Sequence, residues 1–147
     1  MKVIIFGGSG FLGSHVADYF FKKKYQITIF DKNKRNFYNH KYTFIKGDIT
    51  DELKVLKSVK GMDLVINFAG ISDLNYAVNN PQETIQQNIS GNLNILLACK
   101  KNKVKKFIYS SSVYADSEEG GFYKSSKLAS ESYIKEFSKL NKLAMLS

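Results

Sequence analysis

The chain has 147 residues, of which 44% are hydrophobic, and a formal net charge of +9. This length suits one domain that buries its own core, and no apolar run approaches the roughly eighteen residues of a membrane span. The N-terminus lacks the apolar core and cleavage site of a secretory signal, so we predict a cytoplasmic protein without a membrane partner. The lysines are scattered and form no basic helix, so we predict a solvated surface and no nucleic-acid partner.

The chain alternates between strand patterns and helix patterns. Runs of apolar, β-branched and aromatic residues predict strands at 2–6, 26–30, 42–46, 63–68 and 104–109. Apolar residues at helical spacing predict helices at 11–23, 51–59, about 81–100 and 123–140. Strands that alternate with helices imply right-handed crossovers and a parallel sheet covered on both faces. The predicted fold class is therefore a doubly wound α/β domain.

The end of the chain and its single cysteine complete this interpretation. Residues 142–147 have the pattern of a sixth strand that is just beginning, so we expect residues 1–147 to be one domain of a truncated chain. Cys99 lies in an apolar run and has no partner for an internal disulfide, so we predict a buried structural thiol. We predict no metal site.

Four of the ten glycines follow the first predicted strand, in the segment GGSGFLGSH at 7–15. Gly8, Gly10 and Gly13 fit the pattern G-x-G-x-x-G, whereas Gly7, Gly10 and Gly13 fit G-x-x-G-x-x-G, so the register stays open. In either register, glycines permit a tight turn and let a pyrophosphate touch backbone N–H groups at a helix N-terminus. The segment therefore predicts a dinucleotide site at the carboxyl end of the sheet.

Asp31 indicates which dinucleotide. It ends the second predicted strand, where a carboxylate accepts hydrogen bonds from the adenosine ribose hydroxyls and repels a 2′-phosphate. This position favours NAD over NADP. Two alternatives stay open: Asp31 is also a suitable turn residue, and Lys32, Lys34 and Arg35 leave room for a 2′-phosphate.

A second group of residues predicts chemistry. Tyr123 and Lys127 are four residues apart on a predicted helix, so their Cβ atoms lie about 5–6 Å apart on one face. A nearby ammonium stabilises a phenolate and moves the tyrosine pKa toward neutral pH. Ser110, Ser111 and Ser112 follow the fifth predicted strand and emerge at the same edge as the glycine loop. Each pattern also arises by chance, but their order along one fold indicates a catalytic set.

The chain resembles the short-chain dehydrogenase/reductase superfamily, and within it the extended group of NAD-dependent epimerases and dehydratases that act on nucleotide sugars. The resemblance implies a Rossmann fold. It rests on motifs spread over nearly the whole chain: the glycine loop, Asp31, Gly47-Asp48-Ile49, Asn67-Phe68-Ala69-Gly70, Asn88-Ile89-Ser90-Gly91-Asn92, Ser110-Ser111-Ser112 and Tyr123-Lys124-Ser125-Ser126-Lys127.

The resemblance implies catalytic roles for three residues. Tyr123 would be the acid/base, and Lys127 would bind the nicotinamide ribose while tuning Tyr123. Ser112 would be the catalytic hydroxyl, because it is the third residue after the strand pattern that ends at residue 109, as in many epimerases. Only ten residues separate Ser112 from Tyr123, so the intervening loop is short and Ser110 and Ser111 stay as alternatives.

The resemblance also implies cofactor contacts. Asp48 and Ile49 would hold the adenine, and the segment from Phe68 to Gly70 would line the nicotinamide side. Asp48 could instead cap the following helix, and Asn88 could hydrogen-bond only within its own helix. The full set of implied cofactor contacts is Gly7, Gly10, Phe11, Leu12, Gly13, Asp31, Asp48, Ile49, Phe68, Ala69, Gly70, Asn88, Tyr123 and Lys127.

On this resemblance, the chain is the cofactor-binding part of an enzyme that epimerises or dehydrates a nucleotide sugar. The C-terminal portion that completes the sugar pocket in this family is absent from residues 1–147. The alternative is a non-catalytic dinucleotide-binding module or redox sensor of the same fold. Relatives pair through two long helices, which correspond here to 81–100 and 123–140, so a homodimer is implied.

Overall fold

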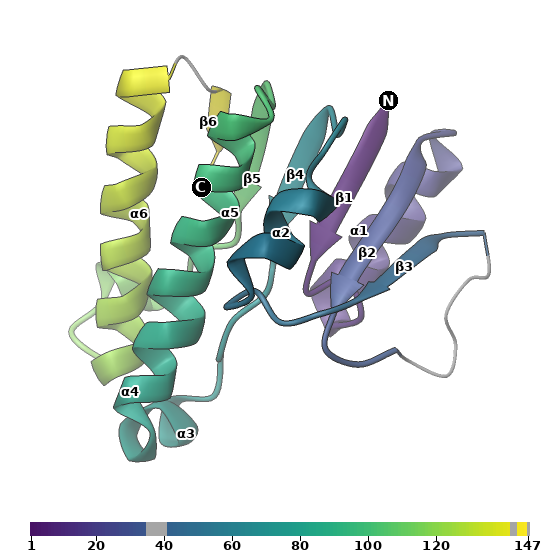
Figure 1. The fold of residues 1–147 in the computed structure, drawn as a ribbon. Coiled ribbons are helices and arrows are strands. Elements are labelled where there is room, and N and C mark those ends of the chain that lie inside the picture. The colour runs from purple at the N-terminus through teal and green to yellow at the C-terminus, as the bar shows by residue number, and fades with distance from the viewer. Residues whose placement is uncertain (35–40, 142–143, 147) are drawn as a thin grey trace.

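The computed structural model describes residues 1–34, 41–141 and 144–146, and it contains one parallel sheet with helices on both faces (Figure 1). The strand order is β3-β2-β1-β4-β5-β6. This arrangement confirms the predicted doubly wound α/β fold. The strands are β1 (Lys2–Phe6), β2 (Gln26–Asp31), β3 (Thr43–Lys46), β4 (Leu64–Asn67), β5 (Lys106–Tyr109) and β6 (Ala144–Leu146). The helices are α1 (Phe11–Lys22), α2 (Glu52–Ser58), α3 (Leu74–Asn79), α4 (Pro81–Thr84), α5 (Gly91–Lys101) and α6 (Gly121–Asn141).

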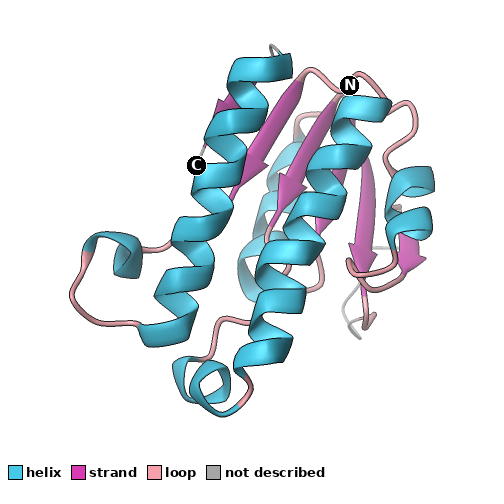
Figure 2. Cartoon of the chain, turned by 60° about the vertical axis from the view of Figure 1, so that its left-hand side comes forward, coloured by secondary structure: helices cyan, strands magenta, loops and turns pink. Residues whose placement is uncertain are grey.

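The core has two layers because successive residues of a strand point to opposite faces of the sheet. Ile4 and Phe6 of β1 pack with residues of α2, α5 and α6, whereas Val3 and Ile5 pack on the other face with Ala17 of α1. All five side chains are fully buried. Figures 1 and 2 show the strands between these two helical layers.

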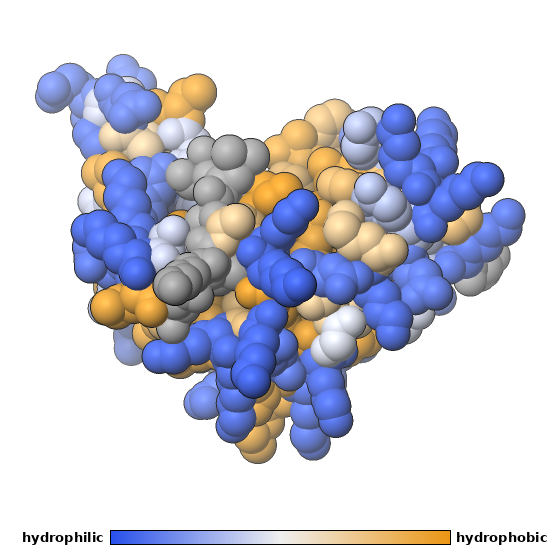
Figure 3. All heavy atoms as spheres, turned by 90° about the horizontal axis from the view of Figure 1, so that it is seen from above, coloured by the Kyte–Doolittle hydropathy of each residue, from blue (hydrophilic) through white to orange (hydrophobic). Residues whose placement is uncertain are grey.

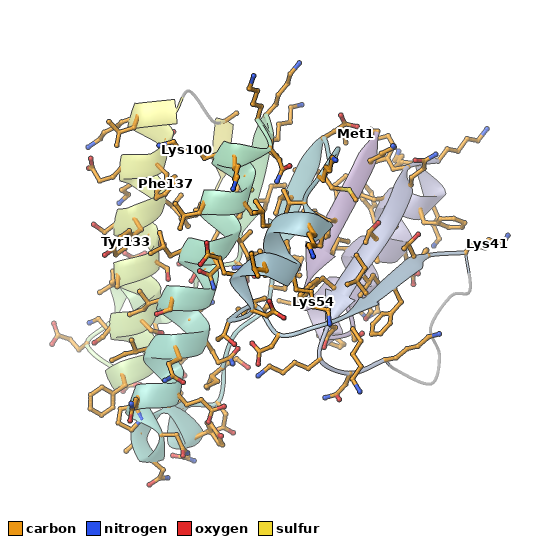
Figure 4. All side chains as sticks on the ribbon, in the orientation of Figure 1. Met1, Lys41, Lys54, Lys100, Tyr133 and Phe137 are labelled. Atoms are coloured by element: carbon orange, nitrogen blue, oxygen red, sulfur yellow. The ribbon has the colours of Figure 1, made fainter. Side chains whose placement is uncertain are left out.

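Two further side chains belong to the first of these layers. Phe137 points from α6 toward α5 in Figure 4 and packs against the core. Cys99 is fully buried, which confirms the prediction of a structural thiol, and burial raises its pKa to about 12. A thiol with this pKa stays protonated at neutral pH and acts as a small apolar side chain.

The long helix predicted at about 81–100 is interrupted. It consists of α4, a π-helical turn η1 (Ile85–Ser90) and α5. A π-helical turn inserts an extra residue into the helical repeat and often occurs at functional sites. The preceding helix α3 was not predicted, because it is only six residues long and lacks a clear apolar repeat. It forms after Asp73, whose side chain accepts a hydrogen bond from the N–H of Tyr76.

The predicted sixth strand is present in part. Residues Ala144–Leu146 form β6 and pair in parallel with β5, while residues 142, 143 and 147 lie outside the described residues. Among the described residues, no helix combines the length and the hydropathy that crossing a membrane requires.

Lysines occupy the last turns of four helices. Lys22, Lys57, Lys101 and Lys139 lie in the last turns of α1, α2, α5 and α6 respectively. A cation at a helix C-terminus interacts favourably with the helix dipole. Hydrophilic side chains cover much of the end of the molecule where β1 begins (Figure 3). Part of the net charge of +9 therefore stabilises helix ends.

The carboxyl ends of the strands meet at one edge of the sheet. Phe6 at the end of β1 pairs with Asn67 at the end of β4, and Asn67 pairs with Tyr109 at the end of β5. Asp31 of β2 pairs with Lys46 of β3. β1 lies between β2 and β4, so the chain continues to β2 on one side of β1 and later crosses to β4 on its other side. This change of direction creates the crevice where doubly wound sheets bind ligands. This is the lower edge of the sheet in Figure 1.

Candidate active site

A cavity of about 690 Å³ lies at this edge of the sheet. It is bounded by the glycine loop, the segments that follow β2, β4 and β5, and the first turns of α6. The lining includes these predicted site residues: Gly7, Gly10, Phe11, Leu12, Gly13, Asp31, Ile49, Phe68, Ala69, Gly70, Ser110, Ser111, Tyr123 and Lys127. Three other predicted site residues, all within the described part of the chain, are not in the lining: Asp48, Asn88 and Ser112.

The structure resolves the register of the glycine loop. Gly7 has a φ of +71°, and a Cβ atom there would lie 2.6 Å from the backbone nitrogen of Ala69. A Cβ atom on Gly13 would lie 2.4 Å from the carbonyl oxygen of Gly7. The pattern that begins at Gly7 therefore meets both requirements, a positive φ and close packing of the helix on the strand. Glycine is required at position 8 for a different reason, because an added Cβ atom there would collide with the side chain of Ile29 on β2.

The N-terminus of α1 faces the cavity and suits an anion. Gly10 is the N-cap of α1, and the first turn contains no acidic residue. The Ser9 hydroxyl is buried and has no hydrogen-bond partner among the described residues. Phe11 and Leu12 line the cavity and are 70% and 55% exposed. A bound dinucleotide would satisfy all of these features, because it brings a pyrophosphate to the helix N-terminus and covers apolar surface.

Asp31 has two roles in the structure. Its Oδ2 accepts a hydrogen bond from the N–H of Ser9 at 2.9 Å, and its Oδ1 accepts one from the N–H of Asn33 at 3.1 Å. The contact with Asn33 gives Asp31 the turn role that the sequence left open. The contact with Ser9 connects β2 to the glycine loop. Because Asp31 also lines the cavity, its carboxylate is available at the place where the ribose is expected.

Asp48 is not among the residues that line the cavity, and four contacts hold its carboxylate. Its carboxylate forms an ion pair with Lys32 at 2.9 Å, accepts from the N–H of Thr50 at 2.9 Å, and accepts from Nε2 of Gln87 at 3.2 and 3.3 Å. Burial by itself raises the pKa of Asp48, but these contacts outweigh burial and lower it to about 2. Asp51, not Asp48, caps α2, which decides the alternative that the sequence left open.

Asn88 connects the π-helical turn to two other segments. Its Oδ1 accepts from the N–H of Ile71 at 2.7 Å, and its Nδ2 donates to the carbonyl oxygen of Ile71 and to Oγ of Ser126, each at 2.9 Å. Ser130 donates to the backbone carbonyl of Asn88 at 2.7 Å. Since Asn88 bonds outside its own helix, it holds the segment after β4 against α6. A Cβ atom on Gly70 would lie 2.6 Å from Oδ1 of Asn88.

Tyr123 and Lys127 are buried on the first turns of α6 and both line the cavity. Nζ of Lys127 lies 5.6 Å from the ring centroid of Tyr123 and 4.8 Å from that of Tyr109, and it donates to the carbonyl oxygen of Ser110 at 2.8 Å. Burial lowers the pKa of Lys127 to about 8, although the nearby carboxylate of Glu131 opposes this shift. The Lys127 ammonium therefore lies close to the rings of both tyrosines.

The three serines have different surroundings. Ser110 and Ser111 line the cavity. The hydroxyl of Ser111 donates to Oε1 of Glu131 at 2.5 Å. Ser112 is the N-cap of a 3₁₀ turn, η2 (Val113–Asp116), and its Oγ accepts from the N–H of Tyr114 at 3.3 Å. Ser112, which the resemblance favours, is therefore engaged in a turn beside the cavity.

Replacing Lys127 by Met is expected to raise the free energy of unfolding at neutral pH by up to about 3 kcal/mol, because it removes a buried ammonium whose pKa has fallen from 10.5 to about 8. Between pH 8 and pH 10.5, Lys127 is deprotonated in the folded wild type but still protonated in the unfolded wild type. The free energy of unfolding of the wild type therefore rises with pH, and the stability difference between the variant and the wild type narrows. Urea unfolding at pH 7 and pH 10 measures this. The matched control is Lys135→Met, at an exposed position of α6, and an equal gain there would contradict the role of burial.

Sequence reasoning missed Gln87 and Glu131, and it named Lys32 only as leaving room for a 2′-phosphate, without its contact to Asp48. Lys32 and Gln87 line the cavity and contact Asp48, but nothing in the local sequence places them together. Glu131 lies four residues after Lys127 on α6, so helical spacing was a signal that could have identified it.

The chain matches known proteins over nearly its whole length. The NAD dependent epimerase/dehydratase family matches residues 3–147. A UDP-glucose 4-epimerase of Klebsiella pneumoniae is 33% identical over 130 residues, which cover 79% of this chain and 94% of that protein.

Solved structures match the fold. The UDP-glucose 4-epimerase of Thermotoga maritima with UDP-glucose has a TM-score of 0.90 at 26% identity, and that of Thermus thermophilus in complex with NAD has a TM-score of 0.90 at 24% identity. Each comparison covers 99% of this chain and 53% of the solved chain, so this chain spans about half of their length. The cofactor in the family description is the one that the glycine loop and Asp31 predicted. The match over residues 3–147 shows that the chain belongs to the NAD-dependent epimerase/dehydratase family.

Proposed function

We propose that this chain is the cofactor-binding part of an NAD-dependent enzyme that epimerises or dehydrates a nucleotide sugar with a Ser/Tyr/Lys set. One observation carries the proposal: Tyr123 and Lys127 line the same cavity as the glycine loop and Asp31. A dinucleotide held by the loop would place its reactive end near a buried tyrosine whose neighbour is an ammonium.

Different residues of the cavity would hold the adenosine end and the nicotinamide end of the cofactor. Gly7, Gly10 and Gly13 would hold the pyrophosphate, and Asp31 would accept hydrogen bonds from the adenosine ribose. Phe68, Ala69 and Gly70 lie across the loop from Asp31, in the segment after β4, and would line the nicotinamide side. NAD, when bound, supplies the acceptor for a hydride from the sugar.

Tyr123 would act on the sugar as the acid/base. As a phenolate it would take the proton from a sugar hydroxyl, and the Lys127 ammonium would stabilise that phenolate at neutral pH. A serine hydroxyl would hydrogen-bond the same sugar oxygen. Ser110 and Ser111 line the cavity, and Ser112 borders it, so separate Ser→Ala variants of the three would identify the serine by its loss of turnover.

The substrate class follows from the relatives. The proteins similar to this chain include UDP-glucose 4-epimerases, and one solved relative holds UDP-glucose, so we expect a UDP-sugar as the substrate. The second candidate is a non-catalytic dinucleotide-binding module of the same fold, which the glycine loop and Asp31 would also serve. Epimerisation of UDP-glucose, measured with and without any sequence beyond residue 147, separates the two.

Calorimetric titration of NAD into the chain is expected to show binding at one site per molecule. The reason is that the glycine loop, Asp31 and the start of α1 form a dinucleotide cradle. Asp31→Ala is expected to weaken NAD binding by about tenfold, the effect of losing hydrogen bonds to a charged acceptor. Asp63→Ala is the matched control, because Asp63 contacts the N–H of Lys2 at the opposite edge of the sheet. Absence of heat with NAD and NADP on folded protein would refute the proposed function.

A homodimer through the two long helices and a cytoplasmic location stay predictions. Leu97 on α5 and Leu128 and Tyr133 on α6 are 40–47% exposed, and these apolar side chains support an interface along the two helices. Tyr133 is labelled on α6 in Figure 4. Sedimentation of the wild type and of Leu128→Glu tests the dimer.

A further inference from the structure

Two loops and the π-helical turn meet beside the expected position of the adenosine ribose. Lys32 directly follows β2, Asp48 follows β3, and Gln87 belongs to the π-helical turn. The Asp48 carboxylate contacts both of the others, Nζ of Lys32 at 2.9 Å and Nε2 of Gln87 at 3.2 Å. Lys32 and Gln87 also line the cavity, whereas Asp48 does not.

Lys34 does not line the cavity and Arg35 lies outside the described residues, which leaves Lys32 as the basic residue after β2 that lines it. Lys32 is adjacent in sequence to Asp31, the residue expected to contact the ribose, and a basic side chain in this region is what accommodates NADP. In the structure, however, the ammonium of Lys32 is paired with Asp48. To bind a 2′-phosphate, Lys32 would have to leave a carboxylate that three other hydrogen-bond contacts hold in place.

The charge state of Asp48 supports this reasoning. The contacts lower its pKa to about 2, so the Asp48 carboxylate is ionised at neutral pH and can pair with Lys32 there.

We infer that Asp48 determines cofactor specificity by holding Lys32 away from the 2′-phosphate position, so that NAD is preferred over NADP. Asp31 excludes the phosphate directly, and Asp48 removes the cation that would otherwise compensate. This inference rests on the proposed dinucleotide site, and it concerns only the ratio of the two affinities. Any contact of Asp48 with the adenine is common to both dinucleotides and cancels in that ratio.

The experiment is a double-mutant cycle on dissociation constants for NAD and NADP, measured by calorimetry on the chain. Asp48→Asn keeps the acceptor for Thr50 and releases Lys32, and it is expected to raise the affinity for NADP relative to NAD by about fivefold, the effect of one good exposed ion pair. The gain is expected to disappear in the double variant Asp48→Asn with Lys32→Met, and to shrink at high salt. Asp51→Asn is the matched control, because it removes the same charge three residues away and keeps the α2 cap.

Three results would overturn the inference. The ratio could stay unchanged in Asp48→Asn, the gain could persist without Lys32, or Asp51→Asn could produce the same gain. Lys32→Met in the wild-type background gives an independent check that does not depend on the folding of Asp48→Asn. It is expected to leave the ratio nearly unchanged, and a clear loss of NADP affinity would show that Lys32 already serves the phosphate. Failure of the wild type to bind either dinucleotide would refute the proposed function, whereas NAD binding with an unaltered ratio refutes this inference alone.

Discussion

Replacing Tyr123 by Phe is expected to abolish turnover of a nucleotide sugar and to leave NAD affinity nearly unchanged. The substitution removes one hydroxyl and keeps a ring that is buried against the cavity, so the cofactor cradle is preserved. Loss of a general acid/base typically slows a reaction by about 10²- to 10⁴-fold. The measurement is the rate of UDP-glucose epimerisation by the full-length natural protein, whether or not it extends beyond residue 147, together with calorimetry of NAD.

The control for this prediction is Tyr133→Phe. Tyr133 is on the same helix, α6, but is 47% exposed, and loss of its hydroxyl is expected to change neither turnover nor NAD binding. If Tyr123→Phe retained wild-type turnover, the acid/base would have to be another group. If it lost NAD binding together with turnover, its role would be in holding the cofactor.

Gly13→Ala is expected to destabilise the domain by about 3 kcal/mol or more and to abolish NAD binding. The added methyl group would lie 2.4 Å from the carbonyl oxygen of Gly7 and 2.8 Å from Cα of Gly8. Both are backbone atoms of the loop, so the helix would have to move away from the strand, and overpacking of this kind typically costs about 1–3 kcal/mol even where side chains can adjust. Thermal unfolding and NAD calorimetry measure the two effects.

Alanine substitutions at two other glycines are expected to cause smaller losses of stability than Gly13→Ala. Gly10→Ala places its Cβ atom 3.1 Å from the oxygen of Gly7, so a smaller loss is expected. Gly121 has a φ of +48° with no atom within 4 Å of an added Cβ, so Gly121→Ala is expected to cost only the strain of that conformation, about 1–2 kcal/mol. Equal losses in all three variants would show that loss of glycine flexibility, and not the close approach at Gly13, controls stability.

Much of the fold was predictable because its signals are local. The strand at 2–6 and the helix at 11–23 were predicted within one residue of β1 and α1, since each depends on the spacing of apolar residues a few positions apart. The helix α3 and the π-helical turn were not predicted. Asn88 makes its hydrogen bonds to Ile71 and Ser126, which are 17 and 38 residues away in sequence, so no local pattern reports them.

The sequence by itself determined the alternation of strands and helices, the presence of a glycine loop after the first strand, and the spacing of Tyr123 and Lys127 on one helix. Tertiary structure decided that Gly7 begins the glycine pattern, that Ser110 and Ser111 rather than Ser112 line the cavity, and that Lys32 pairs with Asp48. The physical reason is range. The relative positions of residues on one helix or strand follow from its fixed repeat. Residues on different loops come together only after parallel strands bring their carboxyl ends to one edge of the sheet.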